Sequence, residues 1–317
     1  MIIKPQRLVV VANIIMDIVI VVDRWPERAG DILAQKGQVT PGGAFNVIAA
    51  AYCLGLPAVY GGLIGTGPFG RVIQQRLTDL KVGMAIPPTS AHRQDTGFDV
   101  AIVEPNGERT FLTVNGYEAR MTTEHLEAMP ISVGDVVYLS GYNLVSEPSA
   151  SALAQWVPTL PQDAMVVLDP GPLIRDIPAG IWGPIMNRLD LLTLNAREAS
   201  LYSGRSEPEA ALPIISSQLS DLSRVLVRAG AMGAWLLDAN GVPRNIPSRV
   251  ARVIDTTGAG DVHTATLLAR LAKGIAWEQA VREANICSSL AVEREGPSAC
   301  PTLVELEAVL AQQGDTQ

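Results

Sequence analysis

Short apolar segments typical of buried strands alternate with helical segments along almost the whole chain. The expected strands are residues 8–11, 58–63, 136–139, 164–168, 191–193, 225–227, 234–237 and 250–254, and the expected helices include 45–54, 71–80, 149–157, 197–203 and 209–219. Parallel strands need crossover connections, usually helices, and these helices bury both faces of the sheet. The sequence therefore predicts an α/β fold in which a central, mostly parallel sheet carries helices on both faces.

Two segments, 14–40 and 97–115, break this alternation. Neither shows helical periodicity, and the second contains the turn sequence Pro105-Asn106-Gly107, so both are predicted to be β-hairpins. Hairpins from two separated places can pair into a small sheet that covers one edge of the core. The expected core then consists of residues 1–13, 41–96 and 116–317, with 14–40 and 97–115 forming the small sheet.

The charge of the chain argues against two classes of partner. It has 24 basic and 32 acidic residues, a net charge of −8, and no basic tract. A protein that binds nucleic acid or an anionic membrane surface would instead present clustered Lys and Arg. A small phosphorylated ligand stays compatible with this charge, because backbone N–H groups and a metal ion can bind phosphates.

Two observations concern the environment of the chain. Cys53, Cys287 and Cys300 have neither paired nor metal-like spacing, so we expect free, buried thiols and a cytoplasmic location. The apolar run 8–22 resembles a signal peptide, but two polar residues interrupt it. It is also shorter than the roughly 20 residues that span a bilayer, and it is rich in Val and Ile, so it should form buried β-structure.

The segment 255–261, Asp-Thr-Thr-Gly-Ala-Gly-Asp, joins a β-like run to a helical pattern. Gly258, Ala259 and Gly260 let backbone N–H groups approach a ligand closely, and a helix N-terminus concentrates unpaired donors and partial positive charge. Asp261 adds a carboxylate, which the helix terminus should keep ionised. An anion pocket beside a carboxylate suits phosphoryl transfer to a hydroxyl group, whereas the plainer alternative is a turn that simply begins a helix.

In its βα-rich context this segment resembles the signature of the ribokinase-like (PfkB) family of carbohydrate and nucleoside kinases. The resemblance implies a ribokinase-like fold, ATP as phosphoryl donor and Mg²⁺ as metal ion. It assigns the catalytic base to Asp261 and the anion hole to the amides of Gly258, Ala259 and Gly260. It also implies that the two hairpins form a lid over the sugar and the contact of a homodimer.

Two features are assigned to the acceptor. Gly42-Gly43-Ala44-Phe45-Asn46 alone would be a glycine-rich turn before a helix. In the family, a di-glycine and an Asn at this place contact substrate hydroxyls, although Asn46 stands one residue closer to Gly43 than is common. Asp17 interrupts an apolar strand, so its carboxylate needs a partner or solvent. The family binds sugar hydroxyls with an Asp here, and a carboxylate accepts two hydroxyl hydrogen bonds.

Two pairs of residues are candidate cation ligands. Asn195 and Glu198 match the family's N-x-x-E motif, which organises Mg²⁺ and its waters; without the resemblance they would be a helix cap and a first-turn Glu. Asp255 and Thr257 match positions near a monovalent-cation site of several members. This match adds K⁺ to the candidate cofactors.

The nucleotide side is assigned through a glycine loop. Arg228, Gly230 and Gly233 follow the strand expected at 225–227 and resemble the family's T/K-x-G-x-x-G loop, with Arg228 where Thr or Lys is usual. Asn285 matches a helix that lines the adenine site in the family.

Residues 65–70, Gly-Thr-Gly-Pro-Phe-Gly, favour a rival class, an NAD-linked oxidoreductase. The pattern G-x-G-x-x-G between a strand and a helix is the dinucleotide fingerprint. However, it lies in the second βα unit, Pro68 removes a phosphate-facing N–H, and no clean strand-ending acidic residue follows about 20 residues on. The sequence therefore disfavours NAD binding.

The preferred hypothesis is an ATP-dependent kinase that phosphorylates a hydroxymethyl group of a sugar or sugar-like molecule. A nucleoside is the alternative acceptor in the same reaction class. The alternative from another class is a catalytically silent relative with a binding or regulatory role, which the intact base and anion-hole sequence disfavour.

Overall fold

The computed structural model describes residues 4–89, 94–106, 108–220, 222–296 and 300–314. Within them, the central sheet contains β1 (Arg7–Val11), β4 (Ala58–Tyr60), β5 (Gly83–Met84), β8 (Asp135–Ser140), β9 (Met165–Asp169), β10 (Leu191–Asn195), β11 (Arg224–Arg228), β12 (Ala234–Leu237) and β13 (Pro243–Ile246). Their order is β13-β12-β11-β10-β9-β8-β1-β4-β5. The strands from β11 to β5 pair parallel, and β12 and β13 add an antiparallel edge. The predicted mostly parallel sheet is confirmed.

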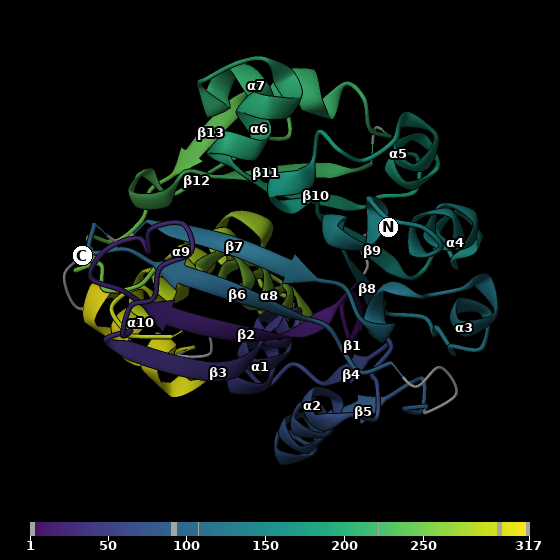
Figure 1. Ribbon diagram of the computed structural model, residues 1–317. Coiled ribbons are helices and arrows are strands. Elements are labelled where there is room, and N and C mark those ends of the chain that lie inside the picture. The colour runs from purple at the N-terminus through teal and green to yellow at the C-terminus, as the bar shows by residue number, and fades with distance from the viewer. Residues whose placement is uncertain (1–3, 90–93, 107, 221, 297–299, 315–317) are drawn as a thin grey trace.

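Helices cover both faces of this sheet, as predicted (Figure 1). One group comprises α1 (Phe45–Cys53), α2 (Pro68–Asp79), α8 (Ala259–Ala272), α9 (Trp277–Ala291) and α10 (Leu303–Gly314), and the other α3 (Thr123–Glu127), α4 (Ser149–Trp156), α5 (Ala179–Met186), α6 (Ala196–Ser203) and α7 (Pro208–Ser216). In β1, Leu8 and Val10 pack with the first group, whereas Val9 and Val11 pack with the second. This alternation follows from the two-residue period of a strand. None of the helices in the described residues is long and apolar enough to cross a bilayer.

One predicted core strand is wrong. Residues 250–254 pair with no strand in the described part of the chain, and Val250 is 95% exposed. The segment is held instead through the amides of Ile254 and Asp255, which donate to the Val292 carbonyl at 2.7 and 3.2 Å. A β-branched composition favours a strand only where a sheet offers a pairing edge.

The two predicted hairpins form a separate four-stranded sheet. It consists of β2 (Ile14–Val21), β3 (Lys36–Gly43), β6 (Phe98–Val103) and β7 (Arg109–Val114), in the order β3-β2-β6-β7. Each hairpin is antiparallel, and β2 and β6 join the hairpins in parallel. β3 continues to Gly43, beyond the end expected at residue 40, and Gly107 of the predicted turn lies outside the described residues.

The face of this sheet that carries Asp17 is called the inner face here. Residues in register on neighbouring strands share a face, which gives three rows: Thr40, Asp17, Asp99 and Thr113; Gln38, Val19, Ala101 and Phe111; Lys36, Val21, Val103 and Arg109. A cavity of about 250 Å³ lies between the inner face and residues 254–257 and 295–296 of the core. The small sheet therefore covers the start of the segment 255–261, for which the sequence predicts phosphoryl transfer.

Two cysteines meet although their spacing gave no sign of it. The thiol of Cys300 donates a hydrogen bond to Sγ of Cys53 at 2.8 Å across a sequence separation of 247 residues. Cys287 is buried in α9 as expected, whereas Cys53 is only partly buried. All three are free thiols.

Candidate active site

Neighbouring parallel strands bring polar side chains to one edge of the central sheet. β9 ends at Asp169, β10 at Asn195 and β11 at Arg228, and Asn195 and Arg228 are register partners. Ligands of open α/β sheets bind outside the carboxyl ends of the strands, where loops and helix N-termini converge. The predicted Mg²⁺ residues and the predicted nucleotide-side Arg therefore lie together.

The N-terminus of α8 carries the predicted base and anion hole. Gly258 precedes the helix in the left-handed region, with φ of 74°, and Asp261 lies in the first turn. First-turn amides have no acceptor within their own helix, although the Ala259 amide donates to the Thr256 carbonyl at 3.3 Å. Residues 262–269 are all buried, so packing holds this turn in place.

Arg228 places a positive charge beside this helix terminus. Its Nη2 pairs with Asp169 at 2.9 Å and lies 4.0 Å from Glu198, while Nε donates to the Leu194 carbonyl at 3.4 Å. Its Nη1 is buried and has no hydrogen-bond partner among the described residues. A Cβ on Gly260 would lie 2.5 Å from that nitrogen. The guanidinium therefore packs directly against the anion-hole backbone and keeps one donor uncommitted.

The ionisation of Asp261 differs from the expectation. Burial and the charge of Asp169 raise the pKa of Asp261 to about 7, opposed by Arg228 and by a hydrogen bond from the Asn46 side chain. The helix terminus alone favours the ionised form, but the loss of hydration and a second carboxylate outweigh it. A pKa near 7 suits a general base at neutral pH.

Asn195 and Glu198 form a capping box at the start of α6. The Asn195 side chain accepts from the Glu198 amide at 2.8 Å, and Glu198 accepts from the Asn195 amide at 2.8 Å and from Nδ2 at 2.6 Å. Burial and the nearby Asp169 raise the pKa of Glu198. The helix-cap interpretation is thus correct, and it does not preclude the metal one.

The described residues contain no cluster of three or more His, Cys, Asp or Glu placed to hold a metal ion. Mg²⁺ needs no such cage, because it commonly binds through one or two carboxylates, retained waters and substrate phosphates. Asp169 and Glu198 both offer carboxylate oxygens near Nη2 of Arg228, at 2.9 and 4.0 Å. This donor set fits Mg²⁺ bound together with a phosphate group.

The predicted acceptor residues meet at the junction of the small sheet and α1. The Asp17 carboxyl packs on Gly42, where a Cβ would overlap it, and Gly43 has a φ of 58° with no room for a Cβ beside the Asn13 carbonyl. Burial and the charges of Asp99 and Asp261 raise the pKa of Asp17 to about 7, whereas Arg109 opposes the shift. Asn46 is buried, and its Oδ1 has no hydrogen-bond partner in the described chain.

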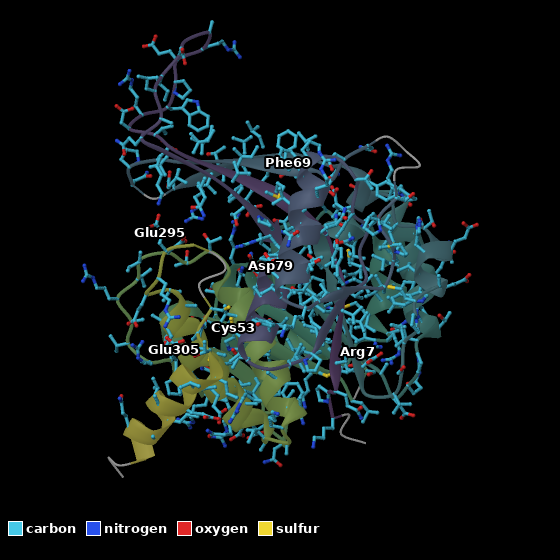
Figure 2. All side chains as sticks on the ribbon, turned by 90° about the horizontal axis from the view of Figure 1, so that it is seen from below. Arg7, Cys53, Phe69, Asp79, Glu295 and Glu305 are labelled. Atoms are coloured by element: carbon cyan, nitrogen blue, oxygen red, sulfur yellow. The ribbon has the colours of Figure 1, made fainter. Side chains whose placement is uncertain are left out.

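Two ion pairs join the small sheet to the core. Arg109 binds Asp255 at 2.7 Å and also donates to the Thr257 hydroxyl, and Lys36 binds Glu295. Figure 2 shows Glu295 on the core side, where it approaches the strands of the small sheet. Hydrogen bonds from Thr257 and Gly296 and the charge of Arg109 lower the pKa of Asp255 against the opposing effect of burial. Asp255 and Thr257, the residues predicted to lie near a K⁺ site, are thus bound to the positively charged guanidinium of Arg109.

The nucleotide-side predictions divide into two groups. Gly230 and Gly233 form the loop after β11, with φ values of 57° and 89°. Asn285 is buried: its side chain bonds His263 Nε2 at 3.1 Å and the Ile246 carbonyl at 2.8 Å. Its carboxamide is therefore committed inside the protein, where it joins α9 to α8 and to β13.

The glycines at 65–70 have a structural explanation. The Asp95 carboxylate accepts from the amides of Phe69 and Gly70 at 2.8 and 2.9 Å, at the N-terminus of α2. A Cβ on Gly67 would collide with Asp95, and one on Gly70 with the Gly65 carbonyl. A side chain of this protein therefore occupies the place where a dinucleotide would put its phosphates.

Three residues that the sequence left without a role belong to this region: Asp99, Arg109 and Asp169. Asp99 could have been noticed as a polar residue within the alternating segment 98–103. Asp169 could have been noticed as the polar end of a buried strand. Their partners Asp17 and Arg228 are distant in sequence, so no local pattern reveals these contacts.

Known families and proteins resemble this chain over most of its length. The pfkB family of carbohydrate kinases matches residues 5–303. A sugar kinase of Escherichia coli K12 described as uncharacterized, YegV, is 33% identical over 306 residues, covering 95% of this chain and 93% of its own. The ribokinase of Arabidopsis thaliana is 27% identical and covers 96% of this chain and 80% of its own.

Solved structures share the fold. Ribokinase from Thermotoga maritima superposes with a TM-score of 0.80 at 22% identity, covering 97% of this chain and 99% of its own. A Burkholderia thailandensis nucleoside kinase in complex with inosine gives 0.75 at 18% identity, covering 97% and 96%. The family match spans nearly the whole chain and the fold is that of ribokinases, so this protein belongs to the pfkB family of carbohydrate kinases.

Proposed function

We propose that this carbohydrate kinase transfers the terminal phosphoryl group of ATP to a hydroxymethyl group of a sugar or sugar-like molecule. The observation that supports the proposal most directly is the position of Asp261. The charges of Asp169 and Arg228, at the carboxyl ends of the core strands, shift the pKa of Asp261, and the charge of Asp261 in turn raises the pKa of Asp17 on the small sheet. A carboxyl between a phosphate-binding edge and an acceptor-binding sheet can take a proton from the attacking hydroxyl.

The chain's own groups then divide the work. Asp261 accepts the hydroxyl proton, and the amides of 258–260 stabilise the transferring phosphoryl group as negative charge moves between oxygens. The free Nη1 of Arg228 adds a charged donor at the same place. Asp17, Gly42, Gly43 and Asn46 hold the acceptor hydroxyls.

On the donor side, Arg228 and the loop at Gly230 and Gly233 face the ATP phosphates. Mg²⁺, when bound with ATP, screens the phosphate charge and aligns the transferring group. Glu198, positioned by Asn195, would hold the ion or its waters. Asn285 contributes to the nucleotide side indirectly, because its side chain holds His263 and the end of β13 in place through hydrogen bonds.

The test is an ADP-release screen of the purified protein against pentoses, hexoses, sugar acids and nucleosides, with and without K⁺. Nucleosides are included because a nucleoside kinase shares the fold, and K⁺ is varied because Asp255 and Thr257 already bind Arg109. Failure of every acceptor to elicit ADP release would instead favour a catalytically silent binding protein.

The matched variant test is Asp261→Asn, with the exposed Asp163→Asn as control. Asp261→Asn keeps the shape and removes the base, so kcat should fall at least about 100-fold, the lower end for general-base catalysis. ATP binding, measured by calorimetry, should be retained because the amides of 258–260 remain. Turnover close to wild type by a folded Asp261→Asn variant would contradict the mechanism.

We further propose that 14–40 and 97–115 act as a lid on the core and that two lids form a homodimer. On the face opposite the inner face, Val39, Leu112 and Val114 are each at least half exposed. Apolar side chains that gather on a surface commonly mark a protein interface. Use of ATP and three free thiols are in keeping with a cytoplasmic location.

A further inference from the structure

A second carboxylate lies beside Asp17 on the inner face of the small sheet. Asp99 of β6 is the register partner of Asp17 of β2, and the pair continues into Thr40 on one side and Thr113 on the other. Register partners on parallel strands point to the same side. The row that contains Asp17 is therefore polar across all four strands, whereas the row next to it holds Val19, Ala101 and Phe111 beside a single polar residue, Gln38.

Asp99 is buried without a hydrogen-bond partner for one of its oxygens. It is 8% exposed, and its Oδ1 has no donor among the described residues. Asn46, 6% exposed, also has an unsatisfied Oδ1. A buried polar atom without a hydrogen-bond partner destabilises the fold, and more so when it is charged. A ligand that donates hydrogen bonds would satisfy the Oδ1 atoms of Asp99 and Asn46.

The charges that face this place leave it negative. Asp99 and Asp261 both act on Asp17, because their charges add to burial in raising the pKa of Asp17. Arg109, whose charge opposes the shift at Asp17, is paired with Asp255, and Arg228 is paired with Asp169. Tyr142 lies close enough for Asp99 and Asp17 to raise its pKa as well. Three carboxyls thus share a region whose arginines already have acidic partners.

We propose that Asp99 is a specificity-determining residue and that the acceptor is an uncharged polyol, with hydroxyls donated to both Asp17 and Asp99. This inference rests on the proposed kinase function and narrows its substrate class. Hydroxyl groups supply the donors that the orphaned oxygens lack. An acceptor that carries a carboxylate or a phosphate would instead face the carboxyls of Asp17 and Asp99, and like charges placed together repel one another.

The experiment compares each neutral pentose or hexose with its aldonic acid and with a phosphate ester of the sugar that keeps a free hydroxymethyl group, using wild type, Asp99→Asn and a control. The control is Glu108→Gln, an exposed acid in the loop of the same hairpin. Wild type should prefer the neutral sugar by at least about 100-fold in kcat/KM. Asp99→Asn should raise the KM of the neutral sugar roughly tenfold or more and leave the KM of ATP unchanged. It should also reduce the preference in kcat/KM for the neutral sugar over the aldonic acid, because one of the repelling charges is gone.

The possible outcomes distinguish the kinase function from the charge of the acceptor. A sugar acid or sugar phosphate as the best wild-type acceptor overturns the uncharged-polyol inference and leaves the kinase function standing. No phosphorylation of any acceptor overturns both. If Asp99→Asn has the acceptor KM of wild type and the same preference for the neutral sugar over the charged acceptors, Asp99 does not determine specificity. The wild-type comparison needs no folded variant, so it decides the charge of the acceptor on its own.

Discussion

The contact between Gly42 and the Asp17 carboxyl makes Gly42→Ala a direct test of acceptor binding. A Cβ on Gly42 would overlap Cγ and both carboxylate oxygens of Asp17. Gly42 does not have a positive φ, so the backbone itself accepts Ala. Asp17 cannot retreat with its strand, because β2 is paired on both sides. The carboxyl must therefore rotate away from the position where it would meet the acceptor.

The expected cost follows from the hydrogen bonds that the rotated carboxylate can no longer make. Hydrogen bonds to a charged group contribute about 1.5–3 kcal/mol, and every 1.4 kcal/mol corresponds to about tenfold in affinity. Gly42→Ala should therefore raise the acceptor KM roughly ten- to a hundredfold. The KM of ATP should not change, because the substitution is on the acceptor side. Both constants come from a coupled ADP assay with the acceptor found by screening.

Two controls decide whether the Asp17 contact is the cause. Gly37→Ala lies on the same strand, β3, and its Cβ would meet nothing within 4 Å, so it should behave as wild type. In an Asp17→Ala background the overlapping carboxyl is absent, so Gly42→Ala should add almost nothing. Additive penalties in the double variant, or an acceptor KM within twofold of wild type for Gly42→Ala, would refute this reasoning.

The remaining predictions concern pH and assembly. Because burial raises the pKa of both Asp17 and Asp261 to about 7, kcat/KM for the acceptor should fall as the pH drops below about 7, where the carboxyls become protonated; a flat profile down to pH 5 would contradict this. As the two carboxyls interact, the profile will report values of the pair. If the outer faces of two lids meet in a dimer, Leu112→Glu should give a monomer in light scattering. The control Val133→Glu, also at an exposed apolar side chain, should leave the dimer intact. A dimer unaffected by Leu112→Glu would place the contact elsewhere.

Local sequence patterns were sufficient for most of the fold. The core strands at 136–139 and 191–193 and the helix that starts at Phe45 follow from apolar periodicity, and the hairpins follow from its absence. Residues 250–254 show the limit of this approach, because their composition suits a strand but the sheet already ends at β13. Pairing edges are a property of the assembled sheet.

The placement of the candidate site residues was predictable where a single segment contains both the reactive side chain and the element that positions it. The turn before α8 is such a segment, because the helix terminus and Asp261 are adjacent in sequence. The ionisation of Asp261 was not predictable, because it depends on burial and on Asp169, which lies on a distant strand. Asp99 was missed for a similar reason: the register of β2 against β6 joins two hairpins that are far apart in the chain.

The course of β3 links an ion pair between the small sheet and the core to the proposed acceptor-binding residues. One strand carries Lys36, which binds Glu295 of the core, at its first residue and Gly42 and Gly43 at its last two, and α1 begins two residues later. A strand paired along its whole length moves as a stiff unit, so a shift at Lys36 is transmitted to the turn under Asp17. Salt that weakens the exposed Lys36–Glu295 pair should therefore alter acceptor affinity from a distance, without competing for the acceptor site.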